Sequence, residues 1–290
     1  MTFAAEVERV WPGRAASFEV LRGGITNHNL KVDVDGEHFV LRVAGKDTNL
    51  LGIDRTVELA ATQAAAALGI GPEVVAFVEP EGWLVTRFVE GAIPPLEHMR
   101  ESATLERVAH ALKVFHDGPA IPGVFDSFRM VETYRQTALE RGGSVPEAFD
   151  RVHEIAARIE HRRATDASVP CHNDLLNANF LDDGERLRIV DWEYAGMGDR
   201  FFDLANFSIN HELDAAQSEA LLAAYFGEVR HADAEALELM RFMSDFREAM
   251  WGVVQSAVSE LDFDFDSYAT EHFDRLERTA ASPAFVAALS

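Results

Sequence analysis

The first part of the chain alternates apolar and polar positions in short runs, a pattern that predicts β-strands. Residues 30–34 alternate in this way, Asp35-Gly36 supplies a turn, and residues 38–43 follow, so a β-hairpin is expected here. A second hairpin is expected over residues 73–88. An alanine-rich helix over residues 56–68, ended by Gly69, lies between the two hairpins. The opening segment is therefore expected to be β-rich.

A helical pattern replaces the strands after the Gly-Pro-containing segment at residues 91–95. Helices are expected over residues 102–117, 129–140, 146–163, 215–227, 233–257 and 267–279, with one β interruption near residues 179–191. These elements predict an α+β, bilobal fold with a β-rich N-terminal lobe over residues 1–90 and a mainly helical lobe over residues 91–290. A ligand cleft is expected where the lobes join.

The amino-acid composition indicates which kinds of binding partner and which cellular compartment to expect. The 290 residues include 49 acidic and 26 basic side chains, a formal net charge of −23. Such a surface repels a phosphate backbone, so nucleic acid is not expected as a partner, whereas a cationic substrate would be attracted. The single cysteine, Cys171, fits a reducing compartment. With neither a signal-peptide pattern nor a long apolar window, we expect a cytoplasmic protein without membrane insertion.

The densest group of chemically capable side chains lies at residues 171–180, read Cys-His-Asn-Asp-Leu-Leu-Asn-Ala-Asn-Phe. Asp174 and Asn179 are five residues apart, so one loop can direct both to a common point. A carboxylate suits a general base, and an amide oxygen suits Mg²⁺. The apolar strand expected at residues 187–190 ends in Asp191, which is placed to supply a second metal ligand. Phosphoryl transfer needs this combination of a base and Mg²⁺-binding oxygens.

These two motifs, His172-Asn173-Asp174 with Asn179 and then Asp191-Trp192-Glu193-Tyr194, resemble the signature loops of the choline/ethanolamine kinase and aminoglycoside phosphotransferase superfamily. The resemblance extends over roughly residues 20–275 and implies a protein-kinase-like fold with ATP and Mg²⁺ as cofactors. By this resemblance, Asp174 is the catalytic base and His172 braces the catalytic loop. Asn179 and Asp191 are the implied metal ligands.

The same resemblance implies a nucleotide site in the β-rich lobe. The segment at residues 22–30 resembles the turn that covers the phosphates, Arg42 takes the place of the kinase lysine and pairs with Glu58, and residues 86–89 resemble the hinge that meets adenine. The cofactor-binding residues expected on this basis are Gly23, Gly24, Thr26, Asn27, Arg42, Glu58, Arg87, Phe88 and Val89.

The acceptor implied by the resemblance is a small cationic alcohol, with choline the leading candidate. In choline kinases, aromatic rings hold the quaternary ammonium group, a cation–π interaction worth roughly 0.5–2 kcal/mol per contact. Trp251 resembles the Trp of the family's late helix and Tyr268 its later Tyr, while Glu193 and Asp203 match acidic positions of the second motif. These four residues are the expected substrate-binding residues.

Other functions remain open at this point. Ethanolamine, thiamine and aminoglycoside kinases would use the same machinery on a different alcohol. A nucleotide-binding pseudokinase would typically lack the base or a metal ligand, yet Asp174, Asn179 and Asp191 are all present. A magnesium-dependent hydrolase would account for the carboxylates but not for the β-rich lobe that carries Arg42.

Overall fold

The computed structural model describes residues 3–21, 27–45, 48–163, 167–259, 261 and 263–290. Its N-terminal region contains an antiparallel five-stranded sheet with strand order β1-β2-β3-β5-β4. Asp35 and Gly36, both with positive φ, form the tight turn of the expected β2–β3 hairpin. The strands are β1 (Ala16–Leu21), β2 (Asn27–Val34), β3 (Glu37–Ala44), β4 (Val74–Val78) and β5 (Trp83–Arg87).

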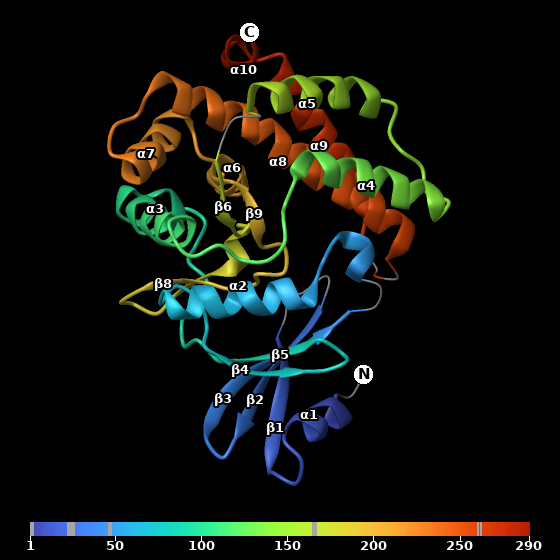
Figure 1. Ribbon diagram of the computed structural model, residues 1–290, viewed down its shortest axis with the longest axis vertical. Coiled ribbons are helices and arrows are strands. Elements are labelled where there is room, and N and C mark those ends of the chain that lie inside the picture. The colour runs from blue at the N-terminus through green and yellow to red at the C-terminus, as the bar shows by residue number, and fades with distance from the viewer. Residues whose placement is uncertain (1–2, 22–26, 46–47, 164–166, 260, 262) are drawn as a thin grey trace.

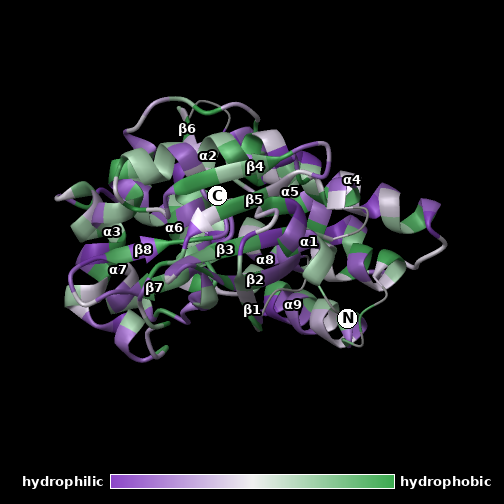
Figure 2. Ribbon diagram, turned by 90° about the horizontal axis from the view of Figure 1, so that it is seen from below, coloured by the Kyte–Doolittle hydropathy of each residue, from purple (hydrophilic) through white to green (hydrophobic). Residues whose placement is uncertain are grey.

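One face of this sheet is covered by a short helix, α1 (Ala4–Val10), which the sequence pattern did not indicate. The alternating apolar residues of β2 and β3, among them Leu30, Val32 and Leu41, are fully buried and pack with Val7 of α1. The sheet therefore has its own small hydrophobic core. Figure 2 shows β4 and β5 as mostly hydrophobic strands near the centre of the view.

The expected alanine-rich helix is α2 (Arg55–Ala67), capped by the Asp54 carboxylate, which accepts hydrogen bonds from the Thr56 and Val57 amides. Its buried Ala61 and Ala65 belong to the large core of the helical region and not to the core of the sheet. Figure 1 shows α2 lying between the sheet and the helices. The two cores therefore do not divide at residue 90, the boundary that the sequence suggested.

The helical region is built around α8 (His231–Val258), which contacts α4, α6 and α9. Two of its helices, α6 and α10, were not expected from the sequence. The remaining helices are α3 (Ser102–His116), α4 (Ser127–Glu140), α5 (Phe149–Arg163), α6 (Arg200–Asn210), α7 (Ala215–Phe226), α9 (Phe265–Ala280) and α10 (Pro283–Leu289). Within the described part of the chain, no helix is both long and apolar enough to cross a bilayer.

Two small two-stranded sheets hold the loops that carry the polar motifs. Strand β6 (Ser168–Cys171) pairs with β9 (Gly196–Asp199), and β7 (Phe180–Asp182) pairs with β8 (Leu187–Ile189). The segment that leaves the N-terminal sheet is attached to the second pair, because the amides of Ala92 and Asp182 each donate to the other residue's carbonyl, at 3.0 and 2.9 Å. The two polar loops thus lie between the sheet and the helices.

Candidate active site

The loop that follows β6 carries His172, Asn173 and Asp174 in a conformation held from several sides. Asn173 has φ = +68°, a left-handed conformation that costs free energy for a residue other than glycine. Its backbone N–H donates to Asp203 Oδ1 at 2.6 Å, and its side-chain amide donates to the Tyr194 carbonyl at 3.0 Å. These bonds compensate the strained backbone and fix the direction in which Asp174 leaves the loop.

Asp203, at the start of α6, lies behind this loop and is fully buried. Its carboxylate accepts hydrogen bonds from the backbone N–H of His172 at 2.8 Å and of Asn173, and it lies 3.0 Å from His116 Nε2. Burial alone would raise the pKa of Asp203, but His116 and the backbone donor hold that pKa below its ordinary value. Asp203 was expected to bind the acceptor. The structure instead buries it behind the loop, where its carboxylate holds the backbone of His172 and Asn173.

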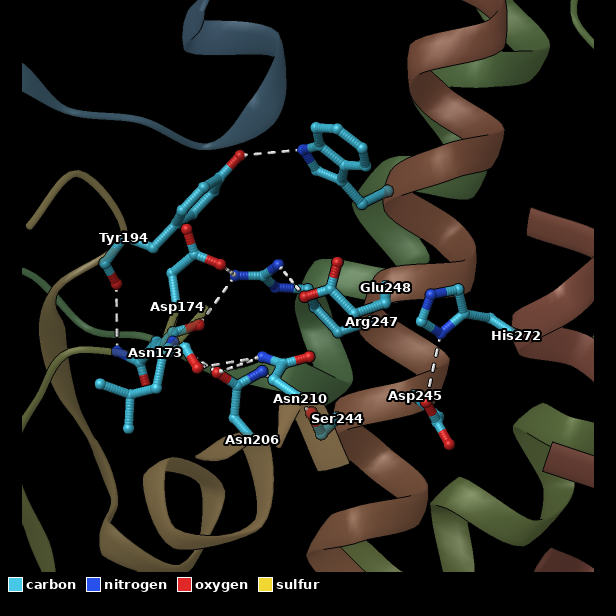
Figure 3. A network of polar contacts seen from close by, with 12 residues as sticks. Asn173, Asp174, Tyr194, Asn206, Asn210, Ser244, Asp245, Arg247, Glu248 and His272 are labelled. Atoms are coloured by element: carbon cyan, nitrogen blue, oxygen red, sulfur yellow. Dashed lines mark hydrogen bonds and ion pairs between the residues drawn. The ribbon is translucent and has the colours of Figure 1, made fainter. Parts of the chain in front are cut away.

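A second side chain of α6 completes the attachment of the loop. Asn206 Oδ1 accepts from the Leu175 amide at 2.5 Å, and Asn206 Nδ2 donates to Ser244 Oγ of α8 at 3.0 Å. Asn210 Nδ2 donates to the Leu175 carbonyl at 3.3 Å. The loop is therefore bonded through α6 to the longest helix of the protein (Figure 3).

The His172 ring joins the two polar loops and does not face the reaction space. Its Nε2 lies 3.0 Å from the Val190 carbonyl, its Nδ1 accepts from the Asp174 amide at 3.2 Å, and the ring packs edge-on against Trp192. Burial lowers the pKa of His172 to about 4, so the ring is neutral at physiological pH. The bracing role of His172 stays a prediction, which this geometry supports.

Asn179 and Asp191 are brought together by backbone pairing between their segments. The Val190 amide donates to the Asn179 carbonyl at 2.9 Å, and the Asn179 side-chain amide donates to the Asp174 carbonyl at 2.8 Å. Asn179 and Asp191 line the same cavity, and Asp191, like Asn173, has φ = +68°. Amide and carboxylate oxygens are the donors that Mg²⁺ prefers, so these two side chains fit the ion.

Burial sets the protonation of both aspartates in the absence of bound cations. It raises the pKa of Asp174 to about 8, although the Arg247 guanidinium opposes the shift. It also raises the pKa of Asp191 to about 6, against the effect of Arg42. A cation that enters beside either carboxylate favours its ionised form. Binding of a cation would therefore favour loss of the proton from both carboxyl groups.

The cavity next to these residues has a volume of about 450 Å³ and lies between the sheet and the two polar loops. Apolar side chains from β3 and β5 form one wall, and Asn179, Asp191 and Trp192 line the opposite side. Of the expected nucleotide-binding residues, those lining it are Arg42, Glu58, Arg87, Phe88 and Val89.

Charged residues join the sheet to the helical region at the deep end of this cavity. The Arg42 guanidinium pairs with Glu58 of α2 and lies 2.9 Å from Asp191 Oδ1, as the expected Arg42–Glu58 pair requires. Asn27 Nδ2 donates to Glu193 Oε2 at 2.7 Å. Arg55, which the sequence analysis missed, contacts Glu58 at 2.7 Å and Glu193 at 3.2 Å.

These contacts change the expected assignment of Glu193. Glu193 was expected to bind the acceptor, but it is bonded to Asn27 and to Arg55, which also contacts Glu58. In the hinge, the Phe88 amide donates to the His38 carbonyl at 3.0 Å, and the Arg87 guanidinium pairs with Glu37 at 2.8 Å. Three further expected residues, Gly23, Gly24 and Thr26, lie outside the described residues.

The expected acceptor residues Trp251 and Tyr268 do lie together, with ring centroids 5.7 Å apart. Trp251 Nε1 donates to Tyr194 Oη at 3.1 Å. Gly252 allows this packing of α8 against α9, because a Cβ at that position would stand 3.0 Å from Tyr268 Cδ1. The rings therefore form an aromatic wall on the helical side of Asp174.

Two charged residues of α8 next to this wall escaped the sequence analysis. Arg247 Nη2 donates to the Asn173 carbonyl at 2.8 Å and lies 3.6 Å from Asp174 Oδ1, and its guanidinium stacks 4.6 Å from the centre of the Tyr194 ring. Glu248 accepts hydrogen bonds from Arg247 and from the Tyr268 hydroxyl. Charged residues among the large apolar side chains of residues 242–254 were the signal that could have found them.

Comparison with known proteins agrees with this geometry. The phosphotransferase enzyme family (APH) matches residues 17–239. Protein LicA of Haemophilus influenzae is 26% identical over 267 residues, covering 87% of this chain and 76% of that protein. Ethanolamine kinase 2 of Rattus norvegicus is 26% identical over 304 residues, covering 93% and 78%.

Among solved structures, the crystal structure of a choline/ethanolamine kinase family protein from Mesorhizobium loti matches with a TM-score of 0.84 and 30% identity. The match covers 99% of this chain and 98% of that one. The predicted α+β kinase-like fold is confirmed by this likeness. The chain belongs to the phosphotransferase enzyme family, and within it to the choline/ethanolamine kinase family.

Proposed function

We propose that this protein transfers the γ-phosphoryl group of ATP to the hydroxyl of a small cationic alcohol. The observation that carries the proposal is that Asn179 and Asp191 line one cavity, while the Asn179 side-chain amide is bonded to the backbone carbonyl of Asp174 at 2.8 Å. Enzymes of the family to which the chain belongs are phosphotransferases. A base and oxygen ligands at adjoining positions are what phosphoryl transfer requires.

The nucleotide would occupy the 450 Å³ cavity, with its base against the apolar wall formed by β3 and β5. The Phe88 amide is already used within the sheet, so contacts from this segment to adenine would fall to Val89 and its neighbours. Arg42, held between Glu58 and Asp191, would meet phosphate oxygens at the deep end. Asn179 and Asp191 would hold Mg²⁺, which neutralises phosphate charge when bound.

In the transfer itself, the Asp174 carboxylate accepts the proton of the acceptor hydroxyl. The alcohol oxygen forms a bond to the γ-phosphorus while the bond from that phosphorus to the β-phosphate oxygen breaks, and ADP leaves. Asn173 and Asp203 hold the loop so that the Asp174 carboxylate keeps its direction. Most of the acceleration would come from positioning and charge neutralisation, because no covalent intermediate with the protein is needed.

Among possible acceptors, the sequence favoured choline, and ethanolamine, thiamine and aminoglycosides were the alternatives. The paired rings of Trp251 and Tyr268 support a cationic group on the acceptor side of Asp174. The relatives include a LicA protein and an ethanolamine kinase, so both small amino alcohols are candidates.

The proposal is tested by measuring ADP release with each of these acceptors, Mg²⁺ and ATP, with the phosphorylated product identified by ³¹P NMR. We expect turnover with at least one small amino alcohol and a loss of about 10³-fold in Asp174→Asn, because the base is removed while the nucleotide cavity is kept. Nucleotide binding without turnover on any acceptor would contradict the proposal and favour a pseudokinase. Equal activity of Asp174→Asn and the unaltered protein would contradict the assignment of the base.

A further inference from the structure

A small cluster of charged residues lies beside the aromatic wall, and the phosphoryl-transfer step gives a role to only one of them. It consists of Asp174 from the catalytic loop and the consecutive residues Arg247 and Glu248 of α8, whose side chains are 12%, 2% and 5% exposed. Figure 3 shows the Arg247 guanidinium lying between the two carboxylates. Its Nη1 donates to Glu248, and its Nη2 lies 3.6 Å from Asp174.

The formal charge of this cluster is unbalanced when all three groups are ionised. Two carboxylates share one guanidinium, so the fully ionised cluster has one net negative charge in a region from which most water is excluded, and without a bound cation Asp174 keeps its proton. Uncompensated buried charge is costly, by several kcal/mol per ion. Two neighbours of the cluster, Tyr194 and Tyr268, are neutral, since burial raises the pKa of both phenols, and the nearby Arg275 is already paired with Asp245. A ligand that brings one positive charge would therefore be stabilised here.

The hydrogen-bonding capacity of Glu248 indicates which kind of cation this is. Its Oε1 accepts from Arg247 and its Oε2 accepts from the Tyr268 hydroxyl at 2.9 Å, whereas a carboxylate can accept about four hydrogen bonds. An ammonium group with N–H bonds can donate to the remaining positions. A quaternary ammonium has no proton to donate and can use only the charge and the ring faces.

The contacts of this carboxylate join it to the aromatic wall that is proposed to receive the acceptor. Tyr268 contacts both Glu248, through its hydroxyl, and Trp251, through its ring. Asp174, which would face the acceptor hydroxyl, is joined to Glu248 through the same guanidinium. A short amino alcohol with its hydroxyl at Asp174 would thus have its amine beside Glu248.

We propose that Glu248 binds the ammonium group of the acceptor and makes the enzyme selective for amino alcohols with a primary amine over those with a quaternary ammonium. The inference rests on the proposed alcohol-kinase function and names the substrate class within it. Arg247 is the positioning residue of this arrangement, because it holds Glu248 and the Asn173 carbonyl at the same time.

The test is a series of acceptors with increasing methylation, from ethanolamine through its N-methyl and N,N-dimethyl derivatives to choline. In the unaltered protein we expect kcat/KM to be highest for ethanolamine and lowest for choline. In Glu248→Gln we expect kcat/KM for ethanolamine to fall by about 10- to 100-fold, the range for a hydrogen bond to a charged group, while that for choline changes much less. The series would then become nearly flat.

Two controls separate this inference from the function on which it rests. Tyr268→Phe removes a donor to Glu248 but keeps its charge, so the preference for primary amines should persist, and the KM for ATP should stay unchanged in both variants. Turnover that is greatest with choline, or an equal loss for all acceptors in Glu248→Gln, would overturn the inference and leave the kinase function standing. Absence of turnover with every member would overturn the inference, and the kinase function would fall as well only if thiamine and the aminoglycosides also gave no turnover. The series in the unaltered protein remains decisive if Glu248→Gln does not fold.

Discussion

The two faces of the catalytic loop differ in how completely their polar groups are paired. On the rear face, the Asp203 carboxylate receives two backbone N–H groups and lies beside His116. On the front face, the nearest positive group to the Asp174 carboxylate is Arg247, at 3.6 Å. Both aspartates are deeply buried, yet the pKa of Asp203 lies below its ordinary value and that of Asp174 is raised to about 8.

The difference shows that neighbouring donors and charges, and not burial alone, decide the state of a buried carboxylate. Three donors outweigh the cost of removing the Asp203 charge from water. One guanidinium does not do so for Asp174, because the carboxylates of Glu248, Asp191 and Glu193 also raise its pKa. The rear face is therefore built for stability. The front face retains capacity for a metal ion, an acceptor hydroxyl and an ammonium group.

The largest effect on stability is expected from Asp203→Ala, which leaves two backbone N–H groups and His116 without their common partner. We expect the free energy of unfolding to fall by about 3–5 kcal/mol, as for removal of one partner of a buried ion pair. Urea unfolding followed by circular dichroism measures this change. Asp174→Ala is the matched control and should cost about 1 kcal/mol or less, because it loses one long contact. A larger loss in the control would reverse the comparison.

A smaller effect is expected from the two asparagines that hold opposite faces of the loop. Asn206→Ala removes the acceptor for the Leu175 amide and should lower the free energy of unfolding by about 1–3 kcal/mol. Asn179→Ala should lower it less, since the Asn179 side chain lines the open cavity, but it should raise the Mg²⁺ concentration needed for half-maximal turnover. Thermal unfolding together with Mg²⁺ titration of activity separates the two. The same loss of stability and the same Mg²⁺ dependence in both variants would contradict the proposed difference between the two faces of the loop.

The smallest effect concerns acid stability. Because the pKa of Asp203 is lowered on folding, its contribution to stability is present above its unfolded pKa of about 3.9 and is lost as the pH falls below it. Asp203→Asn removes this titration. Between about pH 5 and pH 3 the variant should therefore lose stability less steeply than the unaltered protein, as measured by urea unfolding at each pH. Parallel curves would show that Asp203 does not carry a depressed pKa.

Much of the fold could be predicted because its elements have strong local signals. The β2–β3 hairpin follows from alternation and an Asp35-Gly36 turn, and α2 follows from its alanine-rich run and the glycines that end it. The helices α1, α6 and α10 and the strands β1, β6 and β9 were missed. Helix α6 is buried on nearly every side, with Phe201, Phe202, Leu204 and Phe207 all in the core, so it has little polar face to reveal its period.

The candidate site was predicted where the chemistry lies close together in sequence and less well where it depends on tertiary contacts. Asp174, Asn179 and Asp191 lie in two neighbouring loops, and their convergence could be expected from spacing. The positions of Glu193 and Asp203 could not, because each depends on partners far along the chain, such as Asn27 for the first and His116 for the second.

Val190 connects the two polar loops through its backbone alone: its N–H donates to Asn179, and its carbonyl faces His172. Val190 also lines the cavity proposed to hold the nucleotide. A change of side chain at Val190 would therefore alter the shape of the cavity without removing the backbone hydrogen bonds that align the two loops. Exchange for another β-branched or slightly larger apolar side chain would remodel the wall that meets the nucleotide, while the register between the loops is preserved. Nucleotide preference could thus change during evolution, or in an engineered variant, without dismantling the machinery for transfer.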